Sequence, residues 1–288
     1  MKIDYRRKVY NISNIFKNSW RYKMQYRKKF QQLKEKDQKA LIPFTVVGDP
    51  DPETSLEIIK TMTDSGADIL ELGFPFSDPI ADGPIIQSAD IRSLSSNTTP
   101  DKAFEIISKV RKHTDIPIGI LVYYNIIYQR GIEQFYKDAS AAGINSILIA
   151  DMPIEEAKEI IAISKKESID TVFIVSPLTS NERLKQIAES TTGFIYVVAR
   201  LGVTGAQKDL KDTTIDLLKR IRPLTDHPLC VGFGISTPEH VKKVCNSGAD
   251  GAIVGSAIVK IIEKHSKNKK KLLKEISDFI KTLKSATL

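Results

Sequence analysis

Eight short apolar runs alternate with segments of helical spacing from residue 41 onward, and this alternation constrains the fold more than any other feature. The runs are Leu41–Val47, Ile69–Leu72, Ile116–Val122, Ser146–Ile149, Thr171–Val175, Phe194–Val198, Leu229–Val231 and Gly251–Val254. They are nearly continuously apolar, as strands of a parallel sheet covered on both faces must be. Between them apolar residues recur at helical spacing, for example Leu56, Ile59 and Met62.

Eight strand–helix units in one chain predict an α/β fold, the closed (β/α)8 or TIM barrel. The alternative is a doubly wound open sheet, but such a sheet rarely needs eight units, and no G-x-G-x-x-G follows the first run. We therefore expect one barrel domain over residues 24–288, with an N-terminal helix within Gln25–Lys39 and a basic extension over residues 1–23.

Local signals mark the ends of several expected helices. Thr54 with Glu57 three residues later, and Thr237 followed by Pro238, are typical helix starts. Glycines in the left-handed conformation are expected to end the helices at Gly66, Gly143 and Gly248.

Composition excludes several classes of protein. The two cysteines, Cys230 and Cys245, form no CxxC pair, so we expect a reducing, cytoplasmic location rather than a disulfide scaffold. The four histidines show no metal-binding spacing, so no metal is expected. The longest apolar runs, such as Ile118–Tyr124, are far too short to cross a membrane.

The positive charge of the chain lies at its ends. Residues 1–40 hold thirteen Lys and Arg against three acids, and residues 263–288 hold eight Lys against three acids. A basic arm with interleaved aromatic residues is one form of nucleic-acid-binding surface, but no nucleic-acid motif accompanies it, and a solvated, partly helical arm is the simpler interpretation. Residues 1–23 are a real extension, a transit peptide, or the product of a start codon chosen upstream of Met24.

Two carboxylates follow the second strand. Glu71 interrupts an apolar run, so its side chain points opposite to Leu70 and Leu72, toward the barrel interior or mouth. Desolvation there raises a carboxyl pKa toward neutrality, which suits proton transfer. Asp82 lies in the long loop that follows, and two carboxylates at one mouth can serve as acid and base. Tyr123 and Tyr196, by contrast, are expected to pack in the core or at its rim rather than to contact a ligand.

Glycines after the last two strands predict a phosphate site. Gly234 follows strand 7, and Gly255 with Ser256 follows strand 8 and opens a helix. Their backbone N–H groups and the helix N-terminus would hold an anion, at the usual phosphate position of barrel enzymes.

The stretch from Glu71 to Pro84, ELGFPFSDPIADGP, resembles the signature of the tryptophan synthase alpha subunit family. The similarity continues through Leu41–Pro50, Ala150–Pro153, Gly202–Gly205, Gly232–Ser236 and Gly255–Lys260, and covers about residues 25–285. It implies a (β/α)8 barrel and a lyase that cleaves indole-3-glycerol phosphate into indole and glyceraldehyde 3-phosphate.

The resemblance also implies roles for individual residues. Glu71 would be the acid–base group, Asp82 would accept the indole N–H, and Tyr196 would assist. Residues that would hold the indole or the phosphate, or order the closing loop, are Phe44, Leu121, Thr204, Gly205, Gly234, Ile253, Gly255 and Ser256. Leu201 departs from the small polar residue that is frequent in the family, which puts loop closure in doubt.

The family implies a beta subunit in an alpha2–beta2 tetramer, with pyridoxal phosphate in the partner and no cofactor in this chain. Residues expected at that interface are Pro75, Phe76, Asp78 and Asn125, and an exposed Pro and Phe beside the loop would fit a partner surface. Other hypotheses are a sugar-phosphate isomerase on the same barrel, a free-standing lyase, a nucleic-acid-binding protein and a non-catalytic scaffold for the partner.

Deletion of residues 1–23 is expected to leave lyase activity unchanged, because the predicted barrel and all the candidate site residues lie after Met24. Rates of the full chain and of a chain starting at Met24 would be compared in one assay. A large loss in the shorter chain would show that the arm is functional.

Overall fold

A ring of parallel strands forms the centre of the molecule. The computed structural model describes residues 25–198, 212–232 and 234–288. Within them the strands follow the order β5-β4-β3-β2-β1-β9-β8-β7-β6. Their bounds are β1 Ala40–Val46, β2 Leu70–Gly73, β3 Ile118–Val122, β4 Ser146–Ile149, β5 Asp170–Thr171, β6 Phe173–Val175, β7 Ile195–Val198, β8 Leu229–Gly232 and β9 Gly251–Val254. Each predicted run lies within two residues of an observed strand.

The strands at the two ends of this order are two pieces of one run. β5 pairs with β4 and β6 pairs with β7, and only Val172 separates β5 from β6. The Val172 N–H still donates to the Ile147 carbonyl at 3.3 Å. The ring therefore has eight strand positions and is nearly closed, which confirms the predicted (β/α)8 architecture over an open sheet.

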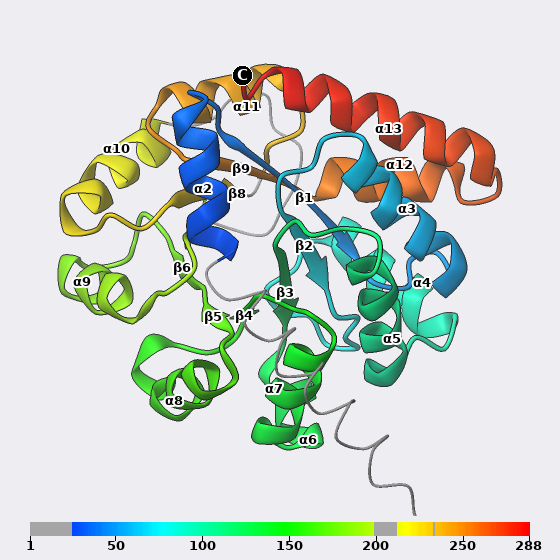
Figure 1. The fold of residues 1–288 in the computed structure, drawn as a ribbon, viewed down its shortest axis with the longest axis horizontal. Helices are drawn as coiled ribbons and strands as arrows, with labels where there is room; N and C mark the ends of the chain where they lie inside the picture. Colours follow the sequence, from blue (N-terminus) through cyan, green and yellow to red (C-terminus); the bar gives the residue numbers. More distant parts are fainter. Residues whose placement is uncertain (1–24, 199–211, 233) are drawn as a thin grey trace, which may run out of the picture.

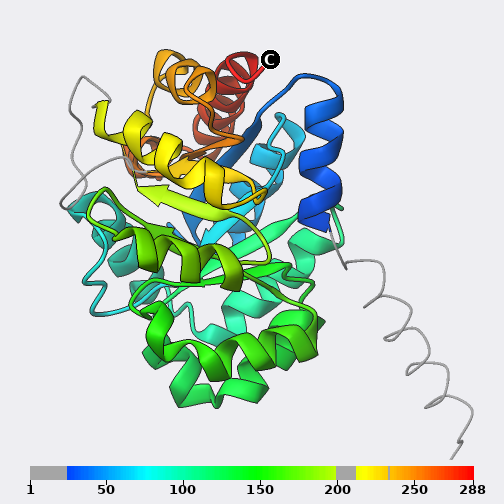
Figure 2. The same ribbon diagram turned by 90° about the vertical axis from the view of Figure 1, so that its left-hand side faces the viewer.

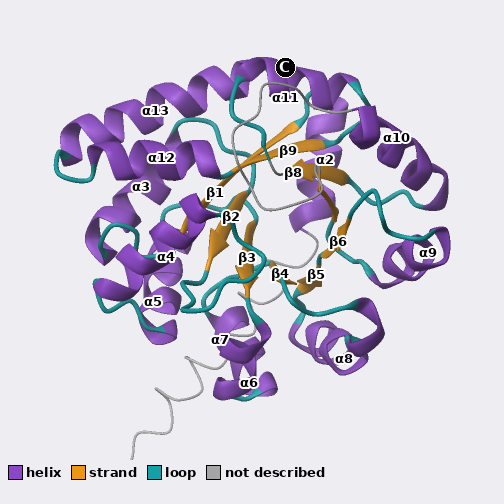
Figure 3. Ribbon diagram, turned by 180° about the vertical axis from the view of Figure 1, so that it is seen from behind, coloured by secondary structure: helices purple, strands orange, loops and turns teal. Residues whose placement is uncertain are grey.

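Helices surround the ring (Figures 1 and 3). Their bounds are α2 Gln25–Glu35, α3 Pro52–Asp64, α4 Pro84–Ser95, α5 Pro100–Arg111, α6 Tyr124–Arg130, α7 Ile132–Ala141, α8 Lys158–Glu167, α9 Asn181–Ser190, α10 Asp212–Ile221, α11 Pro238–Asn246, α12 Ser256–His265 and α13 Lys269–Ser285, with short 3-10 turns at Ile154–Glu156 and Arg222–Leu224. The long interval between the second and third strands holds two helices, α4 and α5, instead of one.

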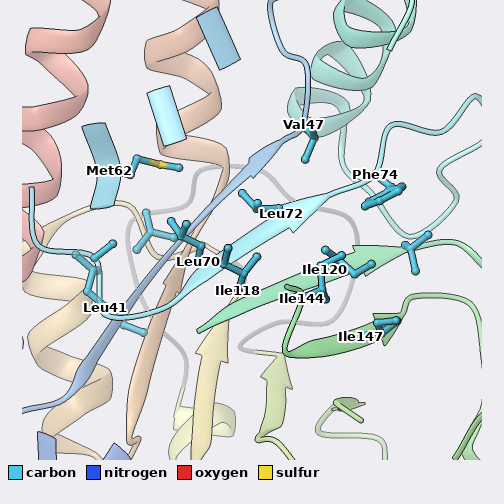
Figure 4. Packing of buried hydrophobic residues seen from close by; sticks show 14 of the residues in the cluster. Leu41, Val47, Met62, Leu70, Leu72, Phe74, Ile118, Ile120, Ile144 and Ile147 are labelled. Carbon is cyan, nitrogen blue, oxygen red and sulfur yellow. The ribbon is translucent and has the colours of Figure 1, made fainter. Parts of the chain in front are cut away.

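Two hydrophobic clusters lie on opposite sides of the strands. The larger one fills the space between the strands and the outer helices, and Figure 4 shows Leu70, Leu72 and Ile120 of this layer with Met62 from α3. The smaller one fills the inside of the barrel and includes Ile42, Phe44 and Tyr196. Burial on both faces explains why the strands are continuously apolar.

Strand register places Glu71 inside the barrel. Phe44 on β1 pairs with Glu71 on β2, which pairs with Gly119 on β3. Leu70 and Leu72, on either side of Glu71, belong to the outer cluster. Alternation along a strand therefore turns Glu71 inward, as the sequence predicted.

Helix α2 closes the barrel at the end where the strands begin. In Figure 2 it lies at the right of the view, and the strand arrows point away from it. Its Tyr26 is 2% exposed, and the Tyr26 hydroxyl lies 2.9 Å from Ser146 Oγ on β4. A side chain at Gly119 would collide with that hydroxyl, since a Cβ there would lie 2.7 Å from it. Tyr26 therefore fills the interior beside β3 and β4 at the end of the barrel where the strands begin.

The helix caps agree with the sequence in part. The Thr237 hydroxyl accepts the His240 N–H and α11 begins at Pro238, while Gly66, Gly143 and Gly248 have positive φ, as expected. The helix start predicted at Thr54 is wrong, because α3 already begins at Pro52. The Asp51 carboxylate caps it instead and accepts the N–H groups of Glu53 and Thr54.

Across residues 25–198, 212–232 and 234–288, every helix falls short of the length and apolar character needed to cross a membrane.

Replacing Tyr26 by Ala is expected to lower the free energy of unfolding by about 3–5 kcal/mol, because it removes a buried ring from the barrel interior. Tyr26→Phe keeps the ring and loses only the hydrogen bond to Ser146, at about 1 kcal/mol. Urea unfolding of both variants measures the two effects, and equal losses would contradict the packing role of the ring.

Candidate active site

A cavity opens at the carboxyl ends of the strands, where barrels place their active sites. Its lining residues are Phe44, Glu71, Asp82, Ile85, Ile86, Leu121, Tyr196, Gly234, Ile235, Ser236, Ile253, Gly255, Ser256, Ala257 and Lys260. Nine of the residues singled out in the sequence lie in this list. Thr204, Gly205 and Leu201 lie outside the described residues.

Glu71 is the most buried acid of the cavity, with 4% of its surface exposed. Its Oε2 atom has no hydrogen-bond partner among the described residues. Burial, and to a smaller extent the negative charge of Asp82, raise the pKa of Glu71 to about 8. The carboxyl group is therefore mostly protonated at neutral pH, and it can give up a proton and take one back.

Asp82 is held by a hydrogen bond that the sequence did not predict. The Tyr123 hydroxyl donates to Asp82 Oδ2 at 2.7 Å and accepts the Ala81 N–H at 3.0 Å. Gln87 on α4 donates from Nε2 to the Asp82 carbonyl at 2.8 Å. Burial raises the pKa of the Asp82 carboxyl, while the hydrogen bond from Tyr123 lowers it. Tyr123 thus favours the ionised form of Asp82.

Tyr196 faces the interior from β7, where it pairs with Cys230 on β8, and its hydroxyl reaches toward Gly232. A Cβ at Gly232 would lie 2.2 Å from the Tyr196 hydroxyl, so only glycine leaves room for the phenol there. Burial, followed by the charges of Glu71 and Asp82, raises the pKa of Tyr196 well above its ordinary value. The side chain is therefore a neutral phenol close to both acids.

One part of the cavity wall is apolar and belongs to the inner cluster. It combines Phe44, Leu121 and Ile253, which were predicted, with Ile85 and Ile86 from the start of α4, which were not. Such a wall fits a flat, uncharged ring.

Another part of the wall suits an anion. Gly255 precedes α12, and no side chain caps the first turn of that helix, which begins at Ser256. Gly234 and Ser236 line the cavity nearby, and Lys260 adds a cation one turn into α12. Backbone N–H groups, a helix N-terminus and an ammonium group together favour a phosphate. Lys260 was not predicted, although its position four residues after Ser256 places both on one helix face.

The residues predicted for the partner surface differ in exposure. Asp78 and Asn125 are exposed, and Phe76 is half-buried. Phe76 and Asn125 line one shallow groove together with Arg130. The expectation that Pro75 is exposed is wrong: it lies only two residues beyond β2 and is still buried, and the chain reaches the surface further along the loop, where Ile80 is 79% exposed.

Within the described ranges, no three or more His, Cys, Asp or Glu side chains gather in a way that could hold a metal ion. The chemistry that these residues themselves offer is proton transfer between carboxyl groups and a bound molecule. The molecule that fits combines an uncharged ring with a phosphate.

Comparison with known sequences gives consistent matches. The sequence profile of the tryptophan synthase alpha chain family matches residues 30–288. The tryptophan synthase alpha chain of Methanothermobacter thermautotrophicus is 50% identical over 256 residues, which cover 89% of this chain and 95% of that protein. That of Vibrio parahaemolyticus is 47% identical over 263 residues, covering 91% and 98%.

Solved structures agree. The tryptophan synthase a2b2 complex of Pyrococcus furiosus includes a chain with a TM-score of 0.80 and 40% identity, covering 85% of this chain and 98% of that one. A tryptophan synthase structure from Mycobacterium tuberculosis gives a TM-score of 0.82 at 27% identity, covering 90% and 96%. The family profile spans the whole barrel, and the relatives match at nearly full length. The chain therefore belongs to the tryptophan synthase alpha chain family.

Proposed function

We propose that this chain is the lyase subunit of a tryptophan synthase and cleaves indole-3-glycerol phosphate into indole and glyceraldehyde 3-phosphate. The observation that carries the proposal is the placement of Glu71, a desolvated carboxyl group with a raised pKa, in one cavity with Asp82 and the open N-terminus of α12.

The two ends of the substrate match the two parts of the cavity wall. The indole ring fits the apolar wall of Phe44, Leu121 and Ile253. The phosphate fits the glycines Gly234 and Gly255 and the first N–H groups of α12. Holding both ends fixes the bond to be broken relative to the carboxylates, and such positioning supplies much of the rate enhancement in enzymes.

Cleavage begins with protonation of the indole ring. Protonated Glu71 gives its proton to ring carbon 3, while the Asp82 carboxylate accepts the hydrogen bond of the ring N–H and stabilises the positive charge that develops on nitrogen. Tyr123 keeps Asp82 ionised and aimed into the cavity.

The carbon–carbon bond then breaks, and its electron pair returns to the ring. The Glu71 carboxylate takes the proton of the adjacent hydroxyl group as that carbon becomes the aldehyde. One proton is given and one is taken, so Glu71 ends in its starting state without any other reagent. Acid–base catalysis of this kind contributes roughly 10²- to 10⁴-fold.

Roles remain for three further residues. Tyr196, a neutral phenol beside both acids, would hydrogen-bond near the reacting carbon atoms. Thr204 and Gly205 would belong to the loop that closes over the substrate and excludes water.

A beta subunit with pyridoxal phosphate would receive the indole, in an alpha2–beta2 assembly in the cytoplasm. The groove beside Phe76 and Asn125, the exposed Asp78 and the exposed Ile80 support a partner surface on this face. Measuring indole release with and without a beta subunit would distinguish a partner-activated subunit from a free-standing lyase.

Glu71→Gln is expected to reduce cleavage at least 10²-fold, because the amide keeps the shape of the side chain but cannot transfer a proton. Turnover of indole-3-glycerol phosphate measures the loss, and the dissociation constant of glycerol 3-phosphate should stay unchanged.

Glu57→Gln, on the outer helix α3, provides a matched control that should retain full activity. Wild-type turnover by the Glu71→Gln variant would reject the acid–base assignment.

The kcat/KM for cleavage is expected to fall as pH rises through about 8, because burial raises the pKa of Glu71 to that value and its proton is then lost. Activity should also fall at acidic pH, where Asp82 becomes protonated. Because burial raises the pKa of Asp82, this fall should occur at a higher pH than an ordinary aspartate would give. A pH–rate profile measures both limbs, and a flat profile from pH 6 to 10 would contradict the role of Glu71.

A further inference from the structure

Asp90 is a buried acid that the reaction steps above do not use. It lies in the middle of α4 with 4% of its surface exposed, and its Oδ2 atom has no hydrogen-bond partner among the described residues. A buried carboxyl group that makes only one hydrogen bond lowers the stability of a protein. The residues that Asp90 contacts therefore indicate which role offsets this cost.

Helix α4 holds both ends of the loop that carries Asp82. Asp90 Oδ1 accepts the backbone N–H of Phe76 at 3.4 Å, at the start of the loop. Gln87, three residues earlier on the same helix face, donates to the Asp82 carbonyl at 2.8 Å, at its end. The two side chains fix the loop between residues 76 and 82 to one rigid element.

The Phe76 contact leads on to Asp82 by a second route. The Phe76 ring stacks on Tyr123, with centroids 5.0 Å apart and planes 23° from parallel. The Tyr123 hydroxyl donates to Asp82 Oδ2 at 2.7 Å. A shift of the Phe76 backbone would move the ring that packs against the donor of Asp82.

We infer that Asp90 is a positioning residue of the lyase site, which acts as an uncharged acceptor for the Phe76 N–H and, through Phe76 and Tyr123, sets the orientation of the Asp82 carboxylate. The inference rests on the proposed function, since it assigns a role within that reaction.

The charges around Asp90 explain why it is uncharged. Burial comes first and the negative charge of Asp82 second, and together they raise the pKa of Asp90 to about 8, against the opposing effect of the Phe76 N–H. Asp49 adds negative charge, and it is itself paired with Arg92 through two hydrogen bonds of 2.7 and 2.9 Å. An uncharged Asp90 places no further negative charge near Asp82. Such a charge would raise the pKa of Asp82 further.

Two substitutions separate the acceptor from the charge. Asp90→Asn keeps an oxygen acceptor and is neutral at every pH, so kcat should stay within about twofold of the wild type. Asp90→Ala removes the acceptor, and kcat should fall about tenfold with little change in KM, since small displacements of a catalytic group reduce the rate more than binding. Equal losses in both variants, or none in Asp90→Ala, would overturn the inference.

Ser93→Ala is the matched control for the stability of α4. Ser93 lies on the same buried face and donates to the Val47 carbonyl at 2.6 Å, away from the loop. It should lower the melting temperature without lowering kcat. A fall in kcat as large as that of Asp90→Ala would show that the loss reflects the helix and not the loop, and would also overturn the inference.

The acidic limb of the pH–rate profile tests the charge directly. If Asp90 is uncharged at acidic pH, Asp90→Asn leaves the midpoint of the acidic limb, which reports the titration of Asp82, unchanged. If Asp90 is ionised, removing its charge moves the limb to lower pH, and the assignment of an uncharged acceptor fails.

A double-mutant cycle with Tyr123→Phe tests the route. Because Asp90 is inferred to act through Tyr123, Asp90→Ala should cost about tenfold in the wild type and less than threefold in the Tyr123→Phe background. Additive losses would refute the route. Wild-type turnover of indole-3-glycerol phosphate is the common reference: its absence would refute the proposed function, whereas its presence with an unaffected Asp90→Ala variant would refute only this inference.

Discussion

The site depends on a carboxyl group kept away from water inside a ring of strands. Glu71 is turned inward by strand alternation, between outward-facing leucines that anchor β2 to the helices. No described cation counters the two effects that raise its pKa, which are burial and the nearness of Asp82. The closed barrel supplies the low dielectric, and Tyr26 maintains it from the opposite end. Without that desolvation, Glu71 would be an ordinary ionised glutamate with no proton to give at neutral pH.

The neighbouring acid, Asp82, has surroundings that favour its ionised form more than those of Glu71 do. It is also partly buried, but the Tyr123 hydroxyl donates to it, and α4 holds the loop on which it lies. The two acids of the cavity thus differ because Asp82 accepts a hydrogen bond from Tyr123, whereas Glu71 Oε2 accepts none from the described residues. This difference assigns proton transfer to Glu71 and charge stabilisation to Asp82.

Most of the architecture could be predicted from the sequence because double burial leaves a local signal, a continuous apolar run for each strand. The break at Val172 was not predicted, since it depends on pairing with strands distant in the sequence. The helix α4 was not predicted either, since its buried face includes the polar residues Asp90 and Ser93. At the site, Glu71 stood out by interrupting such a run, and Gly255 with Ser256 by their place after the last strand. Tyr123 was interpreted as packing and Asp90 was overlooked, because their roles arise from contacts with residues 41 and 14 positions away in the chain.

Because Tyr26 fills the interior at the end where the strands begin, it restricts how substrate and products enter and leave the barrel. Among the described residues, the substrate and both products share the cavity at the carboxyl ends of the strands, beside the loop that carries Asp82. Both products must then leave on the side of the barrel where this loop lies, and a protein bound there would affect their release.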